Sequence, residues 1–162
     1  MNNYQLHRLL KRHYHTSDAF KSCLTADAAP SVITDYPSFF IINQSTSQEI
    51  HGGNRGTHWA VLAFIDERSN AEFFDSRNLG LETYASAVTR SLQLNGNGKI
   101  TTNAVAYQDA NSSACGEFCC WFIDMRCMSV PFDKCMQLLS AHDLKQNEYK
   151  IRSYVTRHMN QI

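Results

Sequence analysis

The sequence predicts the α+β class, in which a mixed β-sheet packs against a central helix. Residues 38–43 and 58–66 are apolar, aromatic and β-branched runs, which are typical of buried strands. Residues 115–128 combine helical spacing with apolar residues at the flanking positions, and this pattern predicts a buried helix. Because helices and strands do not alternate regularly along the chain, their order favours α+β.

The length and composition bound the domain organisation and the environment. A chain of 162 residues with 43% hydrophobic residues predicts one folded domain over residues 1–162. The sequence has no run near the ~18 apolar residues of a membrane span, and its start lacks the apolar core of a signal peptide. We expect an intracellular, monomeric protein that is not secreted, does not contact membranes and keeps its six cysteines reduced.

The formal net charge is zero, with 15 Lys+Arg against 15 Asp+Glu, and this excludes a uniformly basic nucleic-acid binder. The charge is unevenly distributed, because residues 1–15 and 145–162 each sum to +3 and the middle sums to −6. The two basic ends are either solvated helix faces or an electrostatic footprint for DNA or an acidic partner.

The other elements follow from hydrophobic spacing and from turn residues. In the first half of the chain we expect a helix over 3–15, an irregular stretch around Pro30 and Pro37, a strand over 38–43, a loop over 44–57, and strands over 58–66 and 71–75 joined as a hairpin. In the second half we expect a helix over 81–94, a strand over 100–107, the buried helix over 115–128, a helix starting at Pro131, and a C-terminal helix from Leu144 to His158 or Met159. No linker or repeat divides the chain.

Three short segments hold side chains that form a nucleophilic set when they are considered together. His58 opens one predicted strand and Asp75 ends the next, and 17 residues of separation fit an antiparallel pair that places the two side by side. An aspartate there accepts the Nδ1–H bond of the histidine and stabilises the imidazolium. Cys115 begins a helix, where free N–H groups, the helix dipole and a nearby imidazolium favour a thiolate. The set predicts a Cys–His–Asp nucleophile.

Two further residues lie close to Cys115 in the sequence. Gln108 precedes it by seven residues, so its side-chain amide can reach the oxygen of a tetrahedral intermediate together with the Cys115 backbone N–H. Gly116 leaves room for a substrate backbone to approach. Asp109 is an alternative partner for the histidine, but its loop position favours Asp75. Taken singly, a histidine, an aspartate or a buried cysteine has an ordinary structural role, and it is their ordered combination that points to catalysis.

These motifs resemble those of the adenovirus maturation protease (adenain) family, in the clan that includes the SUMO-specific ubiquitin-like proteases. Gly56-Thr57-His58-Trp59 matches the family's His-Trp motif, and residues 111–120 (NSSACGEFCC) are similar to its nucleophile segment. Asp75 and Gln108 fall at the third triad position and at the oxyanion-hole glutamine. Residues 20–30 (FKSCLTADAAP) are similar to an N-terminal motif of proteases from large DNA viruses and virus-like transposons.

The resemblance implies a cysteine endopeptidase with the fold of this clan, which acts on viral or virus-like capsid precursors in a host nucleus, in the cytoplasm or in a virion. Cys115 would attack the peptide bond, His58 would act as base and then acid, Asp75 would orient His58, and Gln108 would stabilise the oxyanion. Family members favour Gly in the substrate near the cleaved bond. The expected substrate-binding residues of this chain are Gly56, Trp59 and Gly116. Trp59 is the candidate wall of a narrow cleft, or alternatively a core aromatic at a strand end.

The sequence requires no cofactor. Adenovirus enzymes, by contrast, are activated by a peptide that is joined through a disulfide to a cysteine upstream of the glutamine. Residues 81–108 contain no cysteine, so this chain is either active without a peptide or binds one non-covalently. DNA as a second cofactor has only the basic termini in its favour. No metal is predicted, because a zinc site from Cys119, Cys120, Cys127 and His142 has no known ligand spacing.

Two alternative functions stay open. A deconjugase that cleaves after Gly-Gly of ubiquitin or a ubiquitin-like modifier would share every catalytic residue, although the small size favours the viral branch. A non-catalytic module that binds DNA or a capsid would rest on the basic termini alone.

Overall fold

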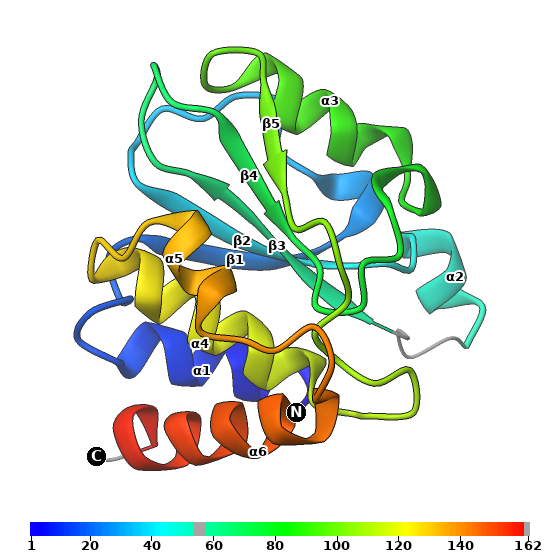
Figure 1. The fold of residues 1–162 in the computed structure, drawn as a ribbon. Helices are drawn as coiled ribbons and strands as arrows, with labels where there is room; N and C mark the ends of the chain where they lie inside the picture. The colour runs from blue at the N-terminus through cyan, green and yellow to red at the C-terminus, as the bar shows by residue number, and fades with distance from the viewer. Residues whose placement is uncertain (54–57, 161–162) are drawn as a thin grey trace.

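The computed structural model describes residues 1–53 and 58–160. Within these residues, five strands form one mixed sheet in the order β1-β2-β3-β4-β5 (Figure 1). The strands are β1 (Phe20–Thr25), β2 (Ser38–Asn43), β3 (Trp59–Phe64), β4 (Ala71–Phe74) and β5 (Ile100–Thr102). The central three strands are antiparallel, whereas β1 and β5 run parallel to their neighbours at the two edges. The sheet is therefore mixed, as predicted.

Helices cover both faces of this sheet. On one face lie α1 (Asn3–Arg12), α4 (Cys115–Cys127) and α6 (Leu144–Tyr154), the last continuing as a π-helical turn over Val155–Met159 (Figure 1). The short α5 (Phe132–Gln137) connects α4 with α6, while α3 (Ser86–Leu94) covers the opposite face and α2 (Ser47–His51) follows β2. Within the described residues, no helix has the length and the apolar character that crossing a bilayer needs.

The two faces of β3 belong to two different hydrophobic clusters. Val61 and Ala63 pack with α1 and α4, while Ala60, Leu62 and Phe64 pack with Val88 and Leu92 of α3. Successive side chains of a strand point to opposite faces, so a strand covered on both sides must be apolar throughout. This explains why residues 59–64 form an uninterrupted apolar run.

The helix α4 is the centre of the larger cluster. It is apolar around most of its circumference because the sheet lies on one side and α1 and α6 lie on the others. Its Phe122 ring stacks on Phe74 of β4, with 4.6 Å between the ring centroids. Near its end, Arg126 makes a two-pronged ion pair with Glu72 of β4, at 2.8 and 2.6 Å. Aromatic packing and a buried ion pair thus hold α4 against the sheet.

The predicted α+β class, with the mixed sheet packed against the helix that starts at Cys115, is confirmed. Several predicted elements need correction. The edge strand β1 was not predicted, because only Phe20 of its six residues is fully buried and the alternation is weak. The predicted loop over 44–57 contains α2, which begins with a capping box of Thr46 and Glu49. The predicted strand over 100–107 ends at Thr102.

Two helix boundaries also differ from the prediction. The helix α1 ends at Arg12, and His13 is already extended. The helix predicted over 81–94 begins at Ser86, after a separate 3₁₀ turn over Leu81–Thr83. Tyr84 has an extended backbone that interrupts the helix, and its hydroxyl reaches the end of β4.

Candidate active site

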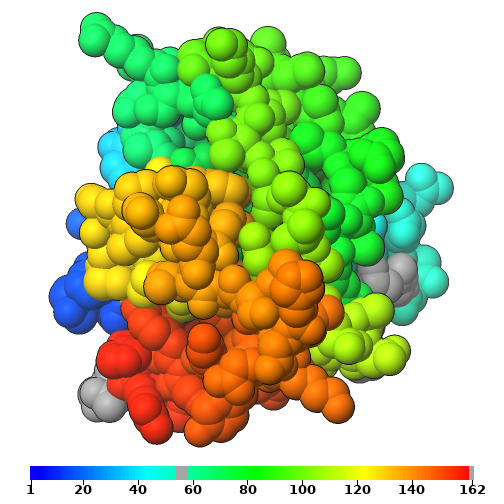
Figure 2. Space-filling model, in the orientation of Figure 1, coloured from blue at the N-terminus to red at the C-terminus, as the bar shows by residue number. Residues whose placement is uncertain are grey.

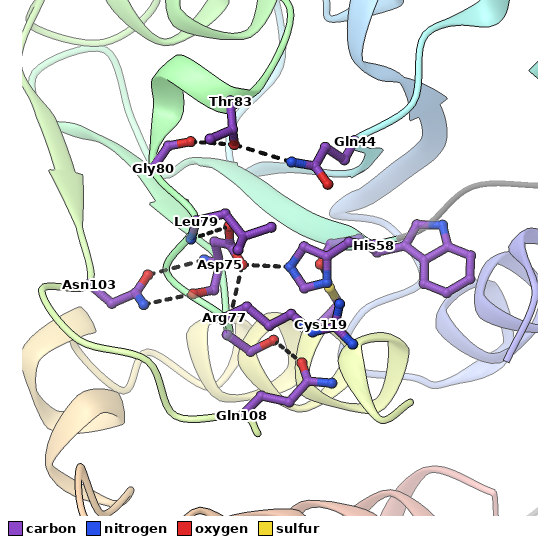
Figure 3. A network of polar contacts seen from close by, with 12 residues as sticks. Gln44, His58, Asp75, Arg77, Leu79, Gly80, Thr83, Asn103, Gln108 and Cys119 are labelled. Carbon is purple, nitrogen blue, oxygen red and sulfur yellow. Dashed lines mark hydrogen bonds and ion pairs between the residues drawn. The ribbon is translucent and has the colours of Figure 1, made fainter. Parts of the chain in front are cut away.

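His58 and Asp75 are in contact at the ends of two adjacent strands. His58 directly precedes β3, Asp75 directly follows β4, and these strands pair antiparallel. The distance from His58 Nε2 to Asp75 Oδ1 is 2.5 Å, and the two side chains are almost completely buried (Figure 3). The predicted bond through Nδ1 is wrong, since the ring presents Nε2 to the carboxylate. Nδ1 has no hydrogen-bond partner of normal geometry and is the nitrogen left for the thiol.

The Asp75 carboxylate is held by donors on both of its oxygens. Oδ1 also accepts the backbone N–H of Arg77 at 3.0 Å. Oδ2 accepts the backbone N–H of Leu79 at 3.1 Å and the hydroxyl of Tyr84 at 3.0 Å. Although burial alone would raise the pKa of Asp75, the hydrogen bond and charge of His58 and these backbone donors lower it. The carboxylate is thus both ionised and fixed in direction.

The backbone around Asp75 is positioned by the Asn103 side chain. Asn103 Oδ1 accepts the Asp75 N–H at 3.0 Å, and Asn103 Nδ2 donates to the Asp75 carbonyl at 2.7 Å (Figure 3). These side-chain bonds take the place of the backbone hydrogen bonds that would have continued the pairing of β5 with β4. For this reason β5 ends at Thr102, one residue before Asn103. The amide therefore terminates a strand and places the carboxylate in one step.

Cys115 is the first residue of α4 and is 3% exposed. Burial alone would raise the pKa of its thiol, but interaction with the His58 side chain and with the Trp59 backbone N–H, together with the charge of Arg77, lowers it. The His58 pKa is raised: burial would lower it, but Asp75 and Cys115 more than offset this effect. The interaction between these two side chains therefore lowers the pKa of the thiol and raises that of the imidazole, which favours the thiolate–imidazolium form of the pair.

Gln108 lies in the segment between β5 and α4, seven residues before Cys115. Its Oε1 accepts the Ser76 hydroxyl at 2.5 Å (Figure 3), and its Nε2 donates to the carbonyl and the hydroxyl of Ser112, at 3.0 and 3.3 Å. The Ser112 hydroxyl in turn accepts the N–H of Ala114, the residue before Cys115. This chain of bonds fixes the amide next to the N-terminus of α4.

The three predicted substrate-binding residues have different outcomes. Gly56 lies outside the described residues. Trp59 is partly buried against the main core, and its Nε1 donates to Asn3 Oδ1 of α1 at 2.6 Å. A Cβ at Gly116 would lie 3.1 Å from Leu6 and 3.3 Å from Met1, so the space beside this glycine is filled by the N-terminal segment. Gly116 therefore allows helix packing, and the expectation that it leaves room for substrate is not supported.

Several residues of the site were missed by the sequence reasoning. Arg77 donates from Nη2 to the Ser112 carbonyl at 2.6 Å and lowers the pKa of Cys115. Tyr84, Asn103 and Ser76 complete the network around Asp75 and Gln108. Ser76 and Arg77 directly follow Asp75 in the sequence. This position at the end of a predicted strand was the one signal that could have indicated their part in the site.

The alternatives for the other polar and sulfur-bearing residues are also resolved. Asp109 accepts the N–H of Asn111 in a turn and is not the partner of His58. All six cysteines are free. Burial raises the pKa of Cys23 and Cys127 to about 12 and that of Cys135 to about 11, and it also raises those of Cys119 and Cys120. Among the described residues, the four-residue zinc set considered from the sequence does not come together.

Comparison with known proteins gives matches among solved structures. No protein-family model matches the sequence, and no curated protein matches it. The crystal structure of ASFV pS273R protease aligns with 99% of this chain and 67% of that chain, with a TM-score of 0.58 and 14% sequence identity. The chain shares the fold of that protease. A crystal structure of the selenomethionine form aligns with 76% of this chain and 44% of that chain, with a TM-score of 0.46 and 16% identity.

The likeness concerns the fold, because 14% identity shows no more than that. This chain spans about two thirds of the length of the first matched structure. Placement next to the adenain family stays a prediction, as does every catalytic role given to an individual residue.

Proposed function

We propose that the chain is a cysteine endopeptidase that uses Cys115, His58, Asp75 and Gln108. The observation that carries this proposal is the buried contact of His58 with Asp75, together with the interaction of His58 with Cys115, the one cysteine whose pKa is lowered. The shared fold with a protease supports the same conclusion. Burial raises the pKa of the other five thiols, which supports Cys115 as the nucleophile.

The geometry suggests the following reaction. The Cys115 thiolate attacks the substrate carbonyl carbon, and the oxygen becomes an oxyanion next to the Cys115 N–H and the Gln108 amide, whose Nε2 exchanges its 3.3 Å bond to the Ser112 hydroxyl for one to the oxyanion. His58 Nδ1–H then gives its proton to the leaving amine, so that a thioester forms and the peptide bond breaks. Water attacks the thioester while Nδ1 takes its proton, which releases the acid and the free thiolate. Asp75 holds Nε2–H throughout.

The proposal is tested by cleavage of a Gly-containing peptide by the wild type and by two cysteine variants. Cys115→Ala is expected to abolish cleavage. Cys127→Ala is the matched control, because this thiol lies at the other end of the same helix and is more exposed. Equal rates for the wild type and Cys115→Ala would exclude the assignment. Gln108→Ala is expected to lower kcat by ~10²–10³.

The substrate class is the finer part of the proposal. We propose viral or virus-like precursor proteins with Gly near the cleaved bond, with Trp59 beside His58 as a wall of the cleft. A short glycine peptide carrying an electrophile is expected to label Cys115 faster than electrophiles derived from ubiquitin or SUMO. Faster labelling by the latter would assign the chain to deconjugation instead.

Contact with DNA is a separate proposal that rests on the two basic termini. The structure places them next to each other, since Arg8 and Arg12 of α1 line one groove with Met159 and Asn160. Figure 2 shows the C-terminal segment, in orange and red, over the lower part of the molecule. If DNA binds there, its affinity should fall steeply with salt, and replacing both arginines should weaken binding while leaving Cys115 alkylation unaltered.

A further inference from the structure

A second cluster of titratable side chains lies where the end of α1 meets α4. His13 follows the last residue of α1, His15 lies two residues further, and Asp124 lies in the last turn of α4. His13 Nε2 and His15 Nδ1 both contact Asp124 Oδ1, at 2.9 and 3.0 Å. Asp124 follows Cys115 by nine residues, which is about 13 Å along a helix, so this cluster is separate from the active site.

We propose that His13, His15 and Asp124 bind a divalent transition-metal ion, with Zn²⁺ preferred. Their three ligand atoms lie within 4.8 Å of one another. Zinc binds imidazole nitrogen and carboxylate oxygen at ~2.0–2.2 Å, so tetrahedral ligands are about 3.4 Å apart. The two contacts to Oδ1, at 2.9 and 3.0 Å, need to widen by a few tenths of an ångström, and the two imidazole nitrogens, within 4.8 Å of each other, need to settle at about 3.4 Å. The ion takes the place of the two hydrogens that now point at Oδ1, and each neutral imidazole carries its proton on the other nitrogen.

The carboxylate is already fixed in the direction that a metal ligand needs. Tyr154 of α6 donates its hydroxyl to Asp124 Oδ2 at 2.5 Å, which leaves Oδ1 for the imidazoles. Outer hydrogen bonds of this kind orient metal ligands and strengthen binding.

Burial and electrostatics also favour a cation at this point. The Asp124 side chain is 1% exposed and lies at the C-terminal end of α4, where the helix dipole disfavours a carboxylate. The His15 side chain is 28% exposed and gives solvent a route to the fourth ligand position. The ion would connect the end of α1, α4 and, through Tyr154, α6. Because the unfolded chain does not hold these groups together, zinc should stabilise the fold.

The test is calorimetric titration of ZnCl₂ into the Cys115→Ser protein, which removes the activated thiol as a competing ligand. One zinc per chain is expected. His15→Ala removes a partly exposed ligand and should weaken binding more than tenfold, and Tyr154→Phe should weaken it ~10-fold while the three ligands stay in place. His142→Ala is the control, because this histidine is exposed and lies outside the cluster. It should bind zinc like the parent protein.

A second measurement covers variants that fold poorly. Zinc should raise the unfolding temperature of the Cys115→Ser protein, and it should not do so when His15→Ala is added. The proposal is overturned if zinc shows no saturable binding to the parent protein. It is also overturned if His15→Ala binds as tightly as His142→Ala, since the histidines would then form only a hydrogen-bonded network with Asp124.

Discussion

Replacing Asp75 with asparagine tests whether one carboxylate both activates Cys115 and holds the end of β4. The substitution keeps the shape of the side chain and removes its charge. Whichever way the new amide turns, its NH₂ faces a backbone N–H, either that of Arg77 or that of Leu79. A buried donor left without its acceptor costs ~1–3 kcal/mol. We expect the free energy of unfolding to fall by about this amount at neutral pH.

The effect on the thiol follows from the bond to His58. Hydrogen bonds to charged groups contribute ~1.5–3 kcal/mol and neutral ones ~0.5–1.5 kcal/mol, so the imidazolium loses about 1–1.5 kcal/mol of stabilisation. This corresponds to about one pKa unit. Because the thiolate of Cys115 depends on that imidazolium, its pKa should rise by about one unit in Asp75→Asn.

The assay is the rate of alkylation of Cys115 by iodoacetamide as a function of pH, read by mass spectrometry of the labelled peptide. It needs no knowledge of the substrate. The wild type should react at a pH where ordinary thiols are protonated, and the curve of Asp75→Asn should lie about one unit higher. Tyr84→Phe is the matched control, since it removes one bond to Oδ2 and keeps the charge. Superimposable curves for the wild type and Asp75→Asn would refute the coupling.

The remaining predictions concern acid stability and two arginines. Since the Asp75 pKa is lowered, its stabilising contribution is complete above the unfolded value of ~3.9 and is lost as pH falls through the folded value. The urea midpoint of the wild type should therefore fall more steeply below about pH 4 than that of Asp75→Asn. Arg77→Met should shift the alkylation curve of Cys115 to higher pH, because its charge lowers that pKa, and no shift would contradict this role. Arg126→Met should cost ~3–5 kcal/mol in urea unfolding because it leaves Glu72 buried and unpaired, and a loss of under about 1 kcal/mol would contradict a structural role for the pair.

The parts of the fold that could be predicted are those in which burial dictates composition. The strand β3 is covered on both faces and must be apolar. The helix α4 is surrounded by the sheet, α1 and α6, so its sequence is also largely apolar. The edge strand β1 is half-exposed, so its side chains carry little pattern, and only its pairing with β2 makes it a strand. Likewise, β5 ends at Thr102 because the Asn103 side chain bonds the backbone of Asp75, which no local pattern reveals.

The same distinction applies to the candidate site. The juxtaposition of His58 and Asp75 follows from antiparallel register, which sequence separation specifies. Which ring nitrogen faces the carboxylate depends on how the His58 ring is turned between Asp75 and Cys115, and the prediction of Nδ1 was wrong. Arg77 reaches Ser112 across 35 residues, and such a contact has no signature in the order of residues.

The helix α4 contributes a residue to each of the two proposed sites, Cys115 at its N-terminus and Asp124 in its last turn. At its N-terminus, free N–H groups and the dipole favour the negative thiolate of Cys115. At its other end the same dipole disfavours negative charge, and the Asp124 carboxylate lies there in contact with His13, His15 and Tyr154. Two of these residues are histidines whose hydrogens a cation can replace. The dipole of one largely buried helix thus favours negative charge at its first residue and positive charge in its last turn.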